Sequence, residues 1–196
     1  MPNKEKIDAL EKVFDEFIRI IDPTGPRSGT AETPRRIAKA WSEWTAGYMI
    51  DPASLMKTFE DGAEHYDQFV IVHNIPILSH CEHHGAAIAG HAHIGYLPNR
   101  RIVGLSKLAR VADAYARRLQ VQERLTSQIA HTVHDTLEAR ATGVIIRASH
   151  GCMSTRGVRI HGSTTTTSCM LGILQDDQAA RAEFMSLCRM AEKDNE

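Results

Sequence analysis

Apolar residues recur at helical spacing in the first part of the chain. Over Lys4–Ile21 they lie three or four positions apart, which predicts an amphipathic helix with one apolar face. The next stretch, 22–26, reads DPTGP and ends that helix, because proline and glycine interrupt helical structure. A second helix is predicted to begin near Thr33, with Pro34 in its first turn, and to run to Gly47.

The rest of the chain alternates between strand-like and helix-like patterns. β-branched residues and alternating polarity predict strands over 69–78, 87–97, 143–149 and 164–174. Helical periodicity predicts helices over 106–118, 122–140 and 177–190. The order ααββααββα indicates an α+β fold that forms one structural unit. Within it we expect a helical region of residues 1–50 packed on a core domain of residues 51–196.

Composition and charge narrow the class of protein. The chain has 196 residues, of which 42% are hydrophobic, and its 23 basic and 24 acidic residues create no field for binding nucleic acid or a membrane. The N-terminus lacks the apolar segment of a secretory leader, and no apolar run is long enough to span a membrane, so we expect a cytoplasmic protein. Its four cysteines then indicate metal binding or burial and not disulfides.

The densest candidate chemistry lies where the first two predicted strands meet. Cys81, His83 and His84 fall close together there, and Cys152 follows much later, two residues after His150. Two sulfurs and one imidazole suit a tetrahedral zinc ion whose fourth position stays open for water, as in catalytic sites. The spacing alone also fits a loop histidine at His83 and a small buried hydrophobe at Cys152.

Cationic residues gather at the start of the predicted helix 106–118. Lys107 and Arg110 lie three residues apart, hence on one face, and Ser106 precedes them. A helix N-terminus offers unpaired N–H groups to a phosphate, and arginine adds bidentate hydrogen bonds. The same pattern also fits an ordinary solvated helix face. Further cations that could reach the same anion are Arg36, Lys39 and Arg156.

Gln122 and Glu123 begin the next predicted helix, and Arg124 follows them. A carboxylate is favourable against the helix dipole at this position and needs no other role. One carboxylate can equally accept the two adjacent donors of guanine, N1–H and the 2-amino group. For Arg124 we expect structural pairing with carboxylates.

Five ordered motifs give the chain a family resemblance. They are S-x-C-E-H-H (79–84), G-x-x-H-I-G-Y-x-P (90–98), G-L-S-K-x-x-R (104–110), Q-x-Q-E-R-L-T (120–126) and H-x-C-M-x-x-R-G (150–157). Together they resemble the successive motifs of the GTP cyclohydrolase I family, from about Thr33 to Phe184. Five motifs in order and at compatible separations are far more specific than any one of them.

The resemblance implies three groups of site residues. The first would hold a zinc ion: Cys81, His84 and Cys152. The second would serve the chemistry: His83, His150, Ser106 and Gln122. The third would bind the substrate, with the carboxylate on guanine and the cations on the triphosphate: Glu123, Lys107, Arg110, Arg156, Arg36 and Lys39. In this scheme His150 protonates N7 of the purine, His83 transfers protons nearer the ribose, and Ser106 assists opening of the sugar.

The implied reaction is zinc-dependent hydrolytic opening of the GTP imidazole ring, release of formate and reclosure to 7,8-dihydroneopterin triphosphate, the first step of pterin and folate biosynthesis. The implied fold is the tunnelling fold, in which antiparallel strand pairs with flanking helices assemble into a multi-subunit barrel. The family forms a decamer of two pentamers with active sites between subunits. The exposed edges of two strand pairs independently indicate a homo-oligomer.

Two other functions compete with this interpretation. The first is a sister activity on the same fold that stops at an opened or cyclic-phosphate product or prefers an oxidised guanine nucleotide, an option that the small residues of loop 85–90 keep open. The second is a catalytically silent zinc-stabilised scaffold, against which the acid/base histidines argue. Thiolate ligands favour zinc, and iron(II) is also compatible.

Two histidines near the candidate ligands and the two remaining cysteines have no role in this scheme. We expect His80 and His91 at ordinary surface or strand positions. Cys169 and Cys188 are expected to be buried or inert and not to be ligands.

Overall fold

The computed structural model describes residues 4–25, 27–60 and 66–193. The chain divides into two compact units, Met1–Ala46 and Gly47–Glu196. The packing of residues 1–50 on a core of residues 51–196 stays a prediction. Among the described residues, no helix is both long and apolar enough to cross a membrane.

The first unit is a helical hairpin that follows the predicted pattern. It contains α1 (Lys4–Ile21), the short 3-10 helix η1 (Ser28–Thr30) and α2 (Thr33–Trp44). Pro34 lies in the first turn of α2, where its missing N–H leaves no helical hydrogen bond unmade. Arg35 of α2 pairs with both Asp8 and Glu11 of α1, and these ion pairs tie the two helices together.

Five strands of the second unit form one mixed sheet in the order β5-β2-β3-β6-β7. Their bounds are β2 (Val70–Cys81), β3 (Ala87–Leu97), β5 (Leu119–Gln120), β6 (Ala141–His150) and β7 (Thr165–Gly172). β5 runs parallel to β2, and the other neighbours are antiparallel. The two expected strand pairs are therefore joined into one sheet, because β3 and β6 pair along their whole length. A second sheet pairs β1 (Thr58–Phe59) with β4 (Ile102–Val103).

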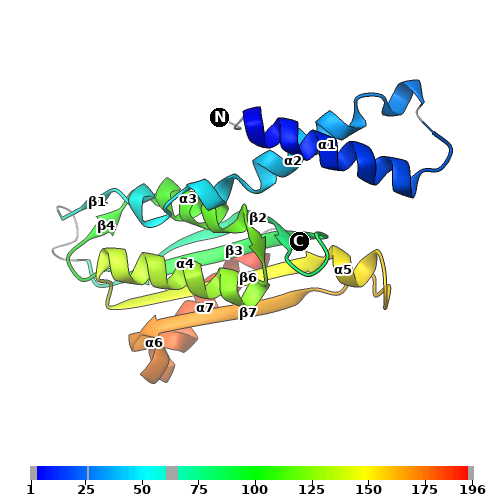
Figure 1. Cartoon of the computed structure of the whole chain (residues 1–196). Coiled ribbons are helices and arrows are strands. Elements are labelled where there is room, and N and C mark those ends of the chain that lie inside the picture. Colours follow the sequence, from blue (N-terminus) through cyan, green and yellow to red (C-terminus); the bar gives the residue numbers. More distant parts are fainter. Residues whose placement is uncertain (1–3, 26, 61–65, 194–196) are drawn as a thin grey trace. The chain divides into compact units, whose positions relative to one another are not determined.

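Helices cover both faces of the larger sheet (Figure 1). The helices that follow α2 are, in chain order, η2 (Ala46–Met49), η3 (Ala53–Leu55), α3 (Leu105–Ala116), α4 (Gln122–Leu137), α5 (Gly151–Ser154), α6 (Ile173–Asp176) and α7 (Gln178–Lys193). α3 and α4 pack on one face over the main core, and α7 packs on the other over a smaller cluster. The predicted α+β class is confirmed, while assembly of subunits into a barrel stays a prediction.

A β-bulge divides β2 into two halves with opposite alternation. The register against β3 shifts between Val72 and Ile75, and Asn74 takes a left-handed φ of 53°. Before the shift, Val72 packs against the core under α3 and α4; after it, Ile75 and Cys81 are buried in the same core. Even-numbered residues thus face this core before the bulge and odd-numbered residues face it afterwards, as an extra residue in a strand requires.

Gly47 was predicted to end the second helix, but it lies in η2 and docks on the end of α3. Its amide donates to the Arg117 carbonyl over 3.0 Å, and Arg118 Nε donates to the Gly47 carbonyl over 3.1 Å. A Cβ at this position would lie 2.1 Å from the Ala114 carbonyl oxygen. Glycine is therefore needed for this close approach of two backbones.

α7 docks on the sheet through one aromatic side chain. Gly95 of β3 pairs with Gly143 of β6, and the fully buried ring of Phe184 fills the space above them. A Cβ would lie 2.8 Å from the Phe184 ring at Gly95 and 2.5 Å from it at Gly143. The two paired glycines therefore form a socket for this ring.

Replacing Gly143 by alanine should destabilise the second unit. The added methyl group overlaps the Phe184 ring, and overpacking of this kind costs about 1–3 kcal/mol. Urea unfolding followed by circular dichroism, at equal protein concentration, measures the change. Gly104→Ala is the matched control, since its Cβ would meet only Lys107 Cγ at 3.8 Å. Equal midpoints for Gly143→Ala and wild type would contradict the socket.

Candidate active site

The turn after β2 presents the first two candidate ligands. β2 extends beyond its predicted end to Cys81, because Ser79 and His80 pair with β3 while His80 and Cys81 pair with β5. The Cys81 amide donates to the Ala86 carbonyl and the Gly85 amide donates to the Cys81 carbonyl, each over 2.8 Å. Gly85 has a φ of 66°, which glycine adopts easily. This tight turn leaves 3.8 Å between Cys81 Sγ and His84 Nδ1.

Cys152 reaches the same place from the end of β6. Ile88 near the start of β3 pairs with His150 at the end of β6, and α5 begins directly afterwards. Strand register thus brings Cys152 next to the turn that follows β2. The ligand atoms of Cys81, His84 and Cys152 all lie within 4.8 Å of one another.

These three side chains fit a zinc ion by their chemistry. Bonds of about 2.3 Å to sulfur and about 2.0 Å to nitrogen separate the two atoms by about 3.5 Å in a tetrahedral site, and the observed sulfur–nitrogen distance of 3.8 Å is close to that. Burial raises the pKa of the Cys152 thiol, and the neighbouring Cys81 raises it further. Two adjacent thiolates therefore need a compensating cation. Three protein ligands leave a coordination position for water.

His83 lies on the same turn but outside this group of three. Its side chain is 63% exposed, and its Nδ1 lies 3.7 Å from Cys81 Sγ. The intervening Glu82 pairs with Arg124 of α4, and this hydrogen bond lowers the pKa of the Glu82 carboxyl. Arg124 Nε also donates to the Gln120 side chain over 3.1 Å. The expected structural pairing of Arg124 is confirmed, and its partner was not foreseen, although an acidic residue between candidate ligands is a usable signal.

A buried amide fixes the orientation of His150. Gln122 is 1% exposed, and its Nε2 lies 3.0 Å from the carbonyl oxygens of both Ile146 and Thr165. Since carbonyls only accept, the amide nitrogen must face them and Gln122 Oε1 must face His150 Nε2, at 2.7 Å. His150 therefore carries a proton on Nε2, which leaves Nδ1 for proton exchange. The sequence suggested no such positioning role for Gln122.

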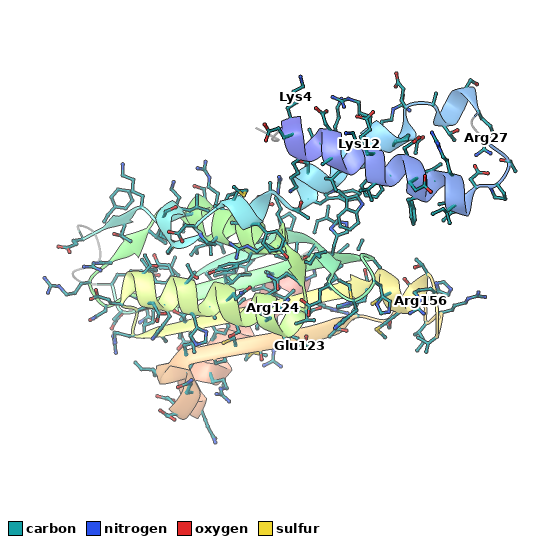
Figure 2. All side chains as sticks on the ribbon, viewed as in Figure 1. Lys4, Lys12, Arg27, Glu123, Arg124 and Arg156 are labelled. Atoms are coloured by element: carbon teal, nitrogen blue, oxygen red, sulfur yellow. The ribbon has the colours of Figure 1, made fainter. Side chains whose placement is uncertain are left out.

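Glu123 and Arg156 come from the same end of the sheet as the three-ligand group (Figure 2). Glu123 is exposed in the first turn of α4, directly after β5. Arg156 is exposed just beyond α5, and its Nη1 lies 3.1 Å from His84 Nε2. Arg156 thus contacts a candidate metal ligand, and Glu123 lies at the same end of the sheet.

Three of the other residues predicted to bind phosphate, all at the start of α3, lie at the opposite end of the sheet. The Val103 amide donates to the Tyr96 hydroxyl over 3.2 Å, and Tyr96 pairs with Val70, the first residue of β2. Cys81 is the last residue of that strand, about 35 Å away at the usual rise per residue. Figure 1 accordingly shows β4, which precedes α3, and α5 at opposite ends. Within one chain, three residues at the start of α3 are therefore not brought to the ligand group: Ser106, Lys107 and Arg110.

Arg36 and Lys39 belong to α2 of the first unit, where both are exposed. Arg36 Nη2 pairs with Glu32 of the same helix over 2.7 Å. Their contribution to a substrate site stays a prediction.

The residues left without a role lie largely where they were expected. His80 is buried in β2, His91 is half-buried in β3, and Cys169 is half-buried in β7. Cys188 is buried on α7 as expected, but its thiol lies near two histidines of the sheet, which the sequence did not suggest.

Comparisons with known proteins identify the family of the chain. The family model for GTP cyclohydrolase I matches residues 10–189. The GTP cyclohydrolase 1 of Nitrosospira multiformis is 49% identical over 179 residues, which cover 91% of this chain and 94% of the relative. That of a Janthinobacterium species is 52% identical over 168 residues, covering 86% and 84%. That of Sinorhizobium fredii is 44% identical over 186 residues, covering 91% and 89%. With this match along nearly its whole length, the chain belongs to the GTP cyclohydrolase I family.

Proposed function

We propose that the chain catalyses zinc-dependent opening of the imidazole ring of GTP, release of C8 as formate and reclosure to 7,8-dihydroneopterin triphosphate. The observation that carries the proposal is the group of two thiols and one imidazole, with His150 held nearby by a buried amide, in a member of this family. The direct test is to incubate the purified protein with GTP and measure formate and the pterin chromophore. Mass spectrometry of the product separates this reaction from one that stops at an opened ring.

Cys81, His84 and Cys152 would hold the zinc ion, as their donor atoms and mutual distances support. A zinc ion held there with an open coordination position would lower the pKa of bound water to about 7. The chain supports the ligands through the hydrogen-bonded turn after β2 and through the pair between Glu82 and Arg124. Such outer contacts orient metal ligands and tune their affinity.

His150 would supply the proton for N7 of the purine, which makes C8 electrophilic. Because its Nε2 proton is held by Gln122, the exchangeable proton would be carried on Nδ1. A histidine suits this role since its ordinary pKa lies near working pH. His83, exposed beside the ligand group, would transfer protons nearer the ribose, and Ser106 would assist opening of the sugar.

Glu123 would select guanine by accepting from N1–H and the 2-amino group together. Its exposed position at the start of α4 leaves the carboxylate available. Adenine has an acceptor at N1 and no 2-amino group, so a bound adenine would cover the carboxylate without pairing it, at a cost of about 1–3 kcal/mol. GTP should therefore be strongly preferred over ATP.

The triphosphate would be bound across a subunit boundary. Arg156 lies at the ligand end of the sheet, whereas Lys107 and Arg110 lie at the far end, too distant to share a small substrate with the same chain's cysteines. A neighbouring subunit can supply them if its far end meets this ligand end. This arrangement supports a homo-oligomer with active sites between subunits, and the family resemblance makes it a decamer of two pentamers.

Replacing Cys152 by alanine should remove the zinc of this site and abolish formate release and pterin formation together. Two remaining ligands hold the ion weakly, and unassisted water is a poor nucleophile. GTP binding should survive, because Glu123 and the cations stay in place. Metal analysis, GTP binding and formate assays measure these effects. Cys169→Ala is the matched control, and unchanged zinc content and formate release in Cys152→Ala would refute the ligand set.

His150→Ala and Gln122→Met should both keep zinc and lose rate. Loss of the acid/base group should lower kcat by about 10²–10⁴-fold, and loss of its positioning amide by about 10–100-fold, with KM for GTP little changed. The double variant should be no slower than His150→Ala, because Gln122 acts through that histidine. Gln128→Met, on the same helix, is the control. A purely structural role of Gln122 would instead give additive losses or raise KM.

Two inactive variants should restore each other if active sites lie between subunits. Arg110→Ala damages the far end of the sheet and Cys152→Ala damages the ligand end, so co-expressed chains should rebuild about a quarter of the sites in a random mixture. His150→Ala with Cys152→Ala is the control, since both changes damage the same end and every site stays defective. Formate release from tandem-tagged mixed oligomers is the measurement. Equal lack of activity in both mixtures would show that one chain holds the whole site.

A further inference from the structure

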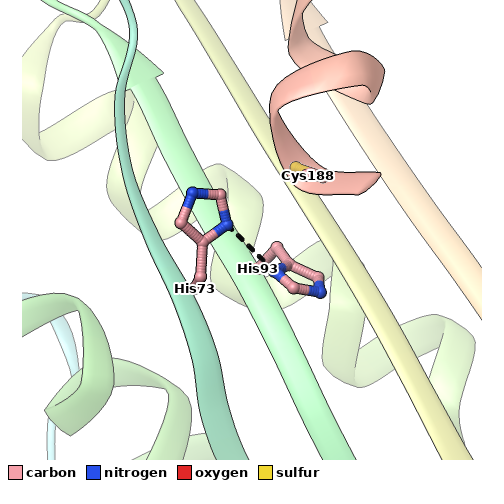
Figure 3. A group of neighbouring side chains, drawn as sticks. All are labelled: His73, His93 and Cys188. Atoms are coloured by element: carbon pink, nitrogen blue, oxygen red, sulfur yellow. Dashed lines mark hydrogen bonds between the residues drawn. The ribbon is translucent and has the colours of Figure 1, made fainter. Parts of the chain in front are cut away.

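We propose that His73, His93 and Cys188 form a second metal site, which binds a divalent ion of the zinc class between the sheet and α7 (Figure 3). The residues come from β2, β3 and α7, and their ligand atoms lie within 4.8 Å of one another. His73 and Cys188 lie outside the five family motifs. The site is therefore separate from the proposed active site and does not depend on the proposed reaction.

The bulge in β2 brings the two histidines together. The register shift between Val72 and Ile75 leaves His73 and Asn74 opposite His93. Asn74 takes the left-handed backbone conformation that asparagine tolerates, and a bulge of this kind redirects its neighbours. The result is a distance of 3.2 Å between His73 Nδ1 and His93 Nδ1.

The docking of α7 brings the thiol to the same place. Phe184 is seated over Gly95, and Cys188 follows it by one turn of helix, a rise of about 6 Å. His93 precedes Gly95 by two residues on the same face of β3, about 6.7 Å along the strand. These two lengths match, so the glycine socket sets Cys188 over His93.

The distances suit a tetrahedral ion. Two imidazole nitrogens bound to one zinc ion lie about 3.3 Å apart, and each lies about 3.5 Å from a bound sulfur. The observed nitrogen–nitrogen distance is 3.2 Å, and the sulfur completes a triangle with no edge longer than 4.8 Å. A small inward movement of Cys188 would therefore complete a His2Cys ligand set.

The burial of the three side chains also suits metal binding. His93 and Cys188 are buried and His73 is partly buried, so water competes little for their donor atoms. Binding of the ion replaces the thiol proton by a metal–sulfur bond and releases that proton to solvent.

A cavity of about 220 Å³ gives an ion access to the site and leaves space for a fourth ligand. His93, Cys188 and Met185 line it, together with Arg147 and Arg189. The two guanidinium groups would repel a further positive charge, so the fourth ligand would be a water or an anion. The ion would then link β2, β3 and α7.

The test is a count of zinc ions in variants of the full chain. Metal-free protein is loaded with zinc ions alone, passed over a desalting column and analysed for metal. Wild type should retain two ions per chain, and Cys188→Ser and Cys152→Ala one each, while the double variant retains none. His73→Asn gives a second, independent removal of the proposed site. Cys169→Ser and His131→Asn are matched controls and should retain both ions.

A second readout isolates the new site. In the Cys152→Ala background, cobalt(II) should give a thiolate-to-metal charge-transfer band that disappears in the double variant with Cys188→Ser. Zinc should likewise raise the unfolding temperature of the single variant and not of the double one, because ligands stabilise the state that binds them. Formate release by Cys188→Ser, near the wild-type rate, shows that this variant is folded.

The outcomes separate this proposal from the proposed function. One ion per chain in wild type, or equal ion counts in wild type, Cys188→Ser and His73→Asn, would overturn the second site and leave the reaction untouched. Two ions per chain in a protein that releases no formate from GTP would support the second metal site and contradict the proposed reaction.

Discussion

The antiparallel ladder between β3 and β6 is the constraint on which both proposed sites depend. Its ten residue pairs run from Ile88 with His150 to Leu97 with Ala141. At one end it brings Cys152 to the turn after β2, and near the other it pairs the two glycines that seat α7. Because alternate residues face opposite sides, a slip of one residue would send His93 into the core under α3 and α4 and break both arrangements.

Two sets of polar contacts near the candidate active site start from the same turn of α4. Gln122 of α4 joins β6 and β7 through two carbonyls and holds His150, while Arg124 of the same helix holds the turn after β2 through Glu82. The first turn of α4 thus fixes both the acid/base group and the ligand turn. Gln122 is buried, and buried polar contacts are costly to leave incomplete, so its hydrogen bonds stabilise a single arrangement. The same helix turn carries Glu123, so the carboxylate proposed to bind guanine shares this support.

Local patterns predicted the elements well and the pairing poorly. α1 has the predicted bounds because its periodicity is long and DPTGP follows it. β2 extends to Cys81 through pairing with β5, and no pattern within the strand reports that partner. The group of Cys81, His84 and Cys152 was predicted from motifs, whereas the remote position of Arg110 follows from the direction of α3, which sequence order leaves open. His73 and Cys188 are separated by most of the sequence of the second unit. A lone cysteine on an amphipathic helix gave no sign that the two side chains lie close together.

Because of the extra residue at its bulge, the number of residues in β2 matters as much as their identity. Asn74 belongs to the bulge that adds one residue to the strand. Every side chain after the bulge therefore points to the face opposite to the one that regular alternation would give. Deleting one residue between Val72 and Ile75 would restore a regular ladder and turn Cys81 away from the core that now buries it. The strand can therefore accept substitutions, whereas an insertion or deletion would change which side chains face the core. A sequence alignment with a gap inside β2 would therefore match residues that face opposite sides of the sheet.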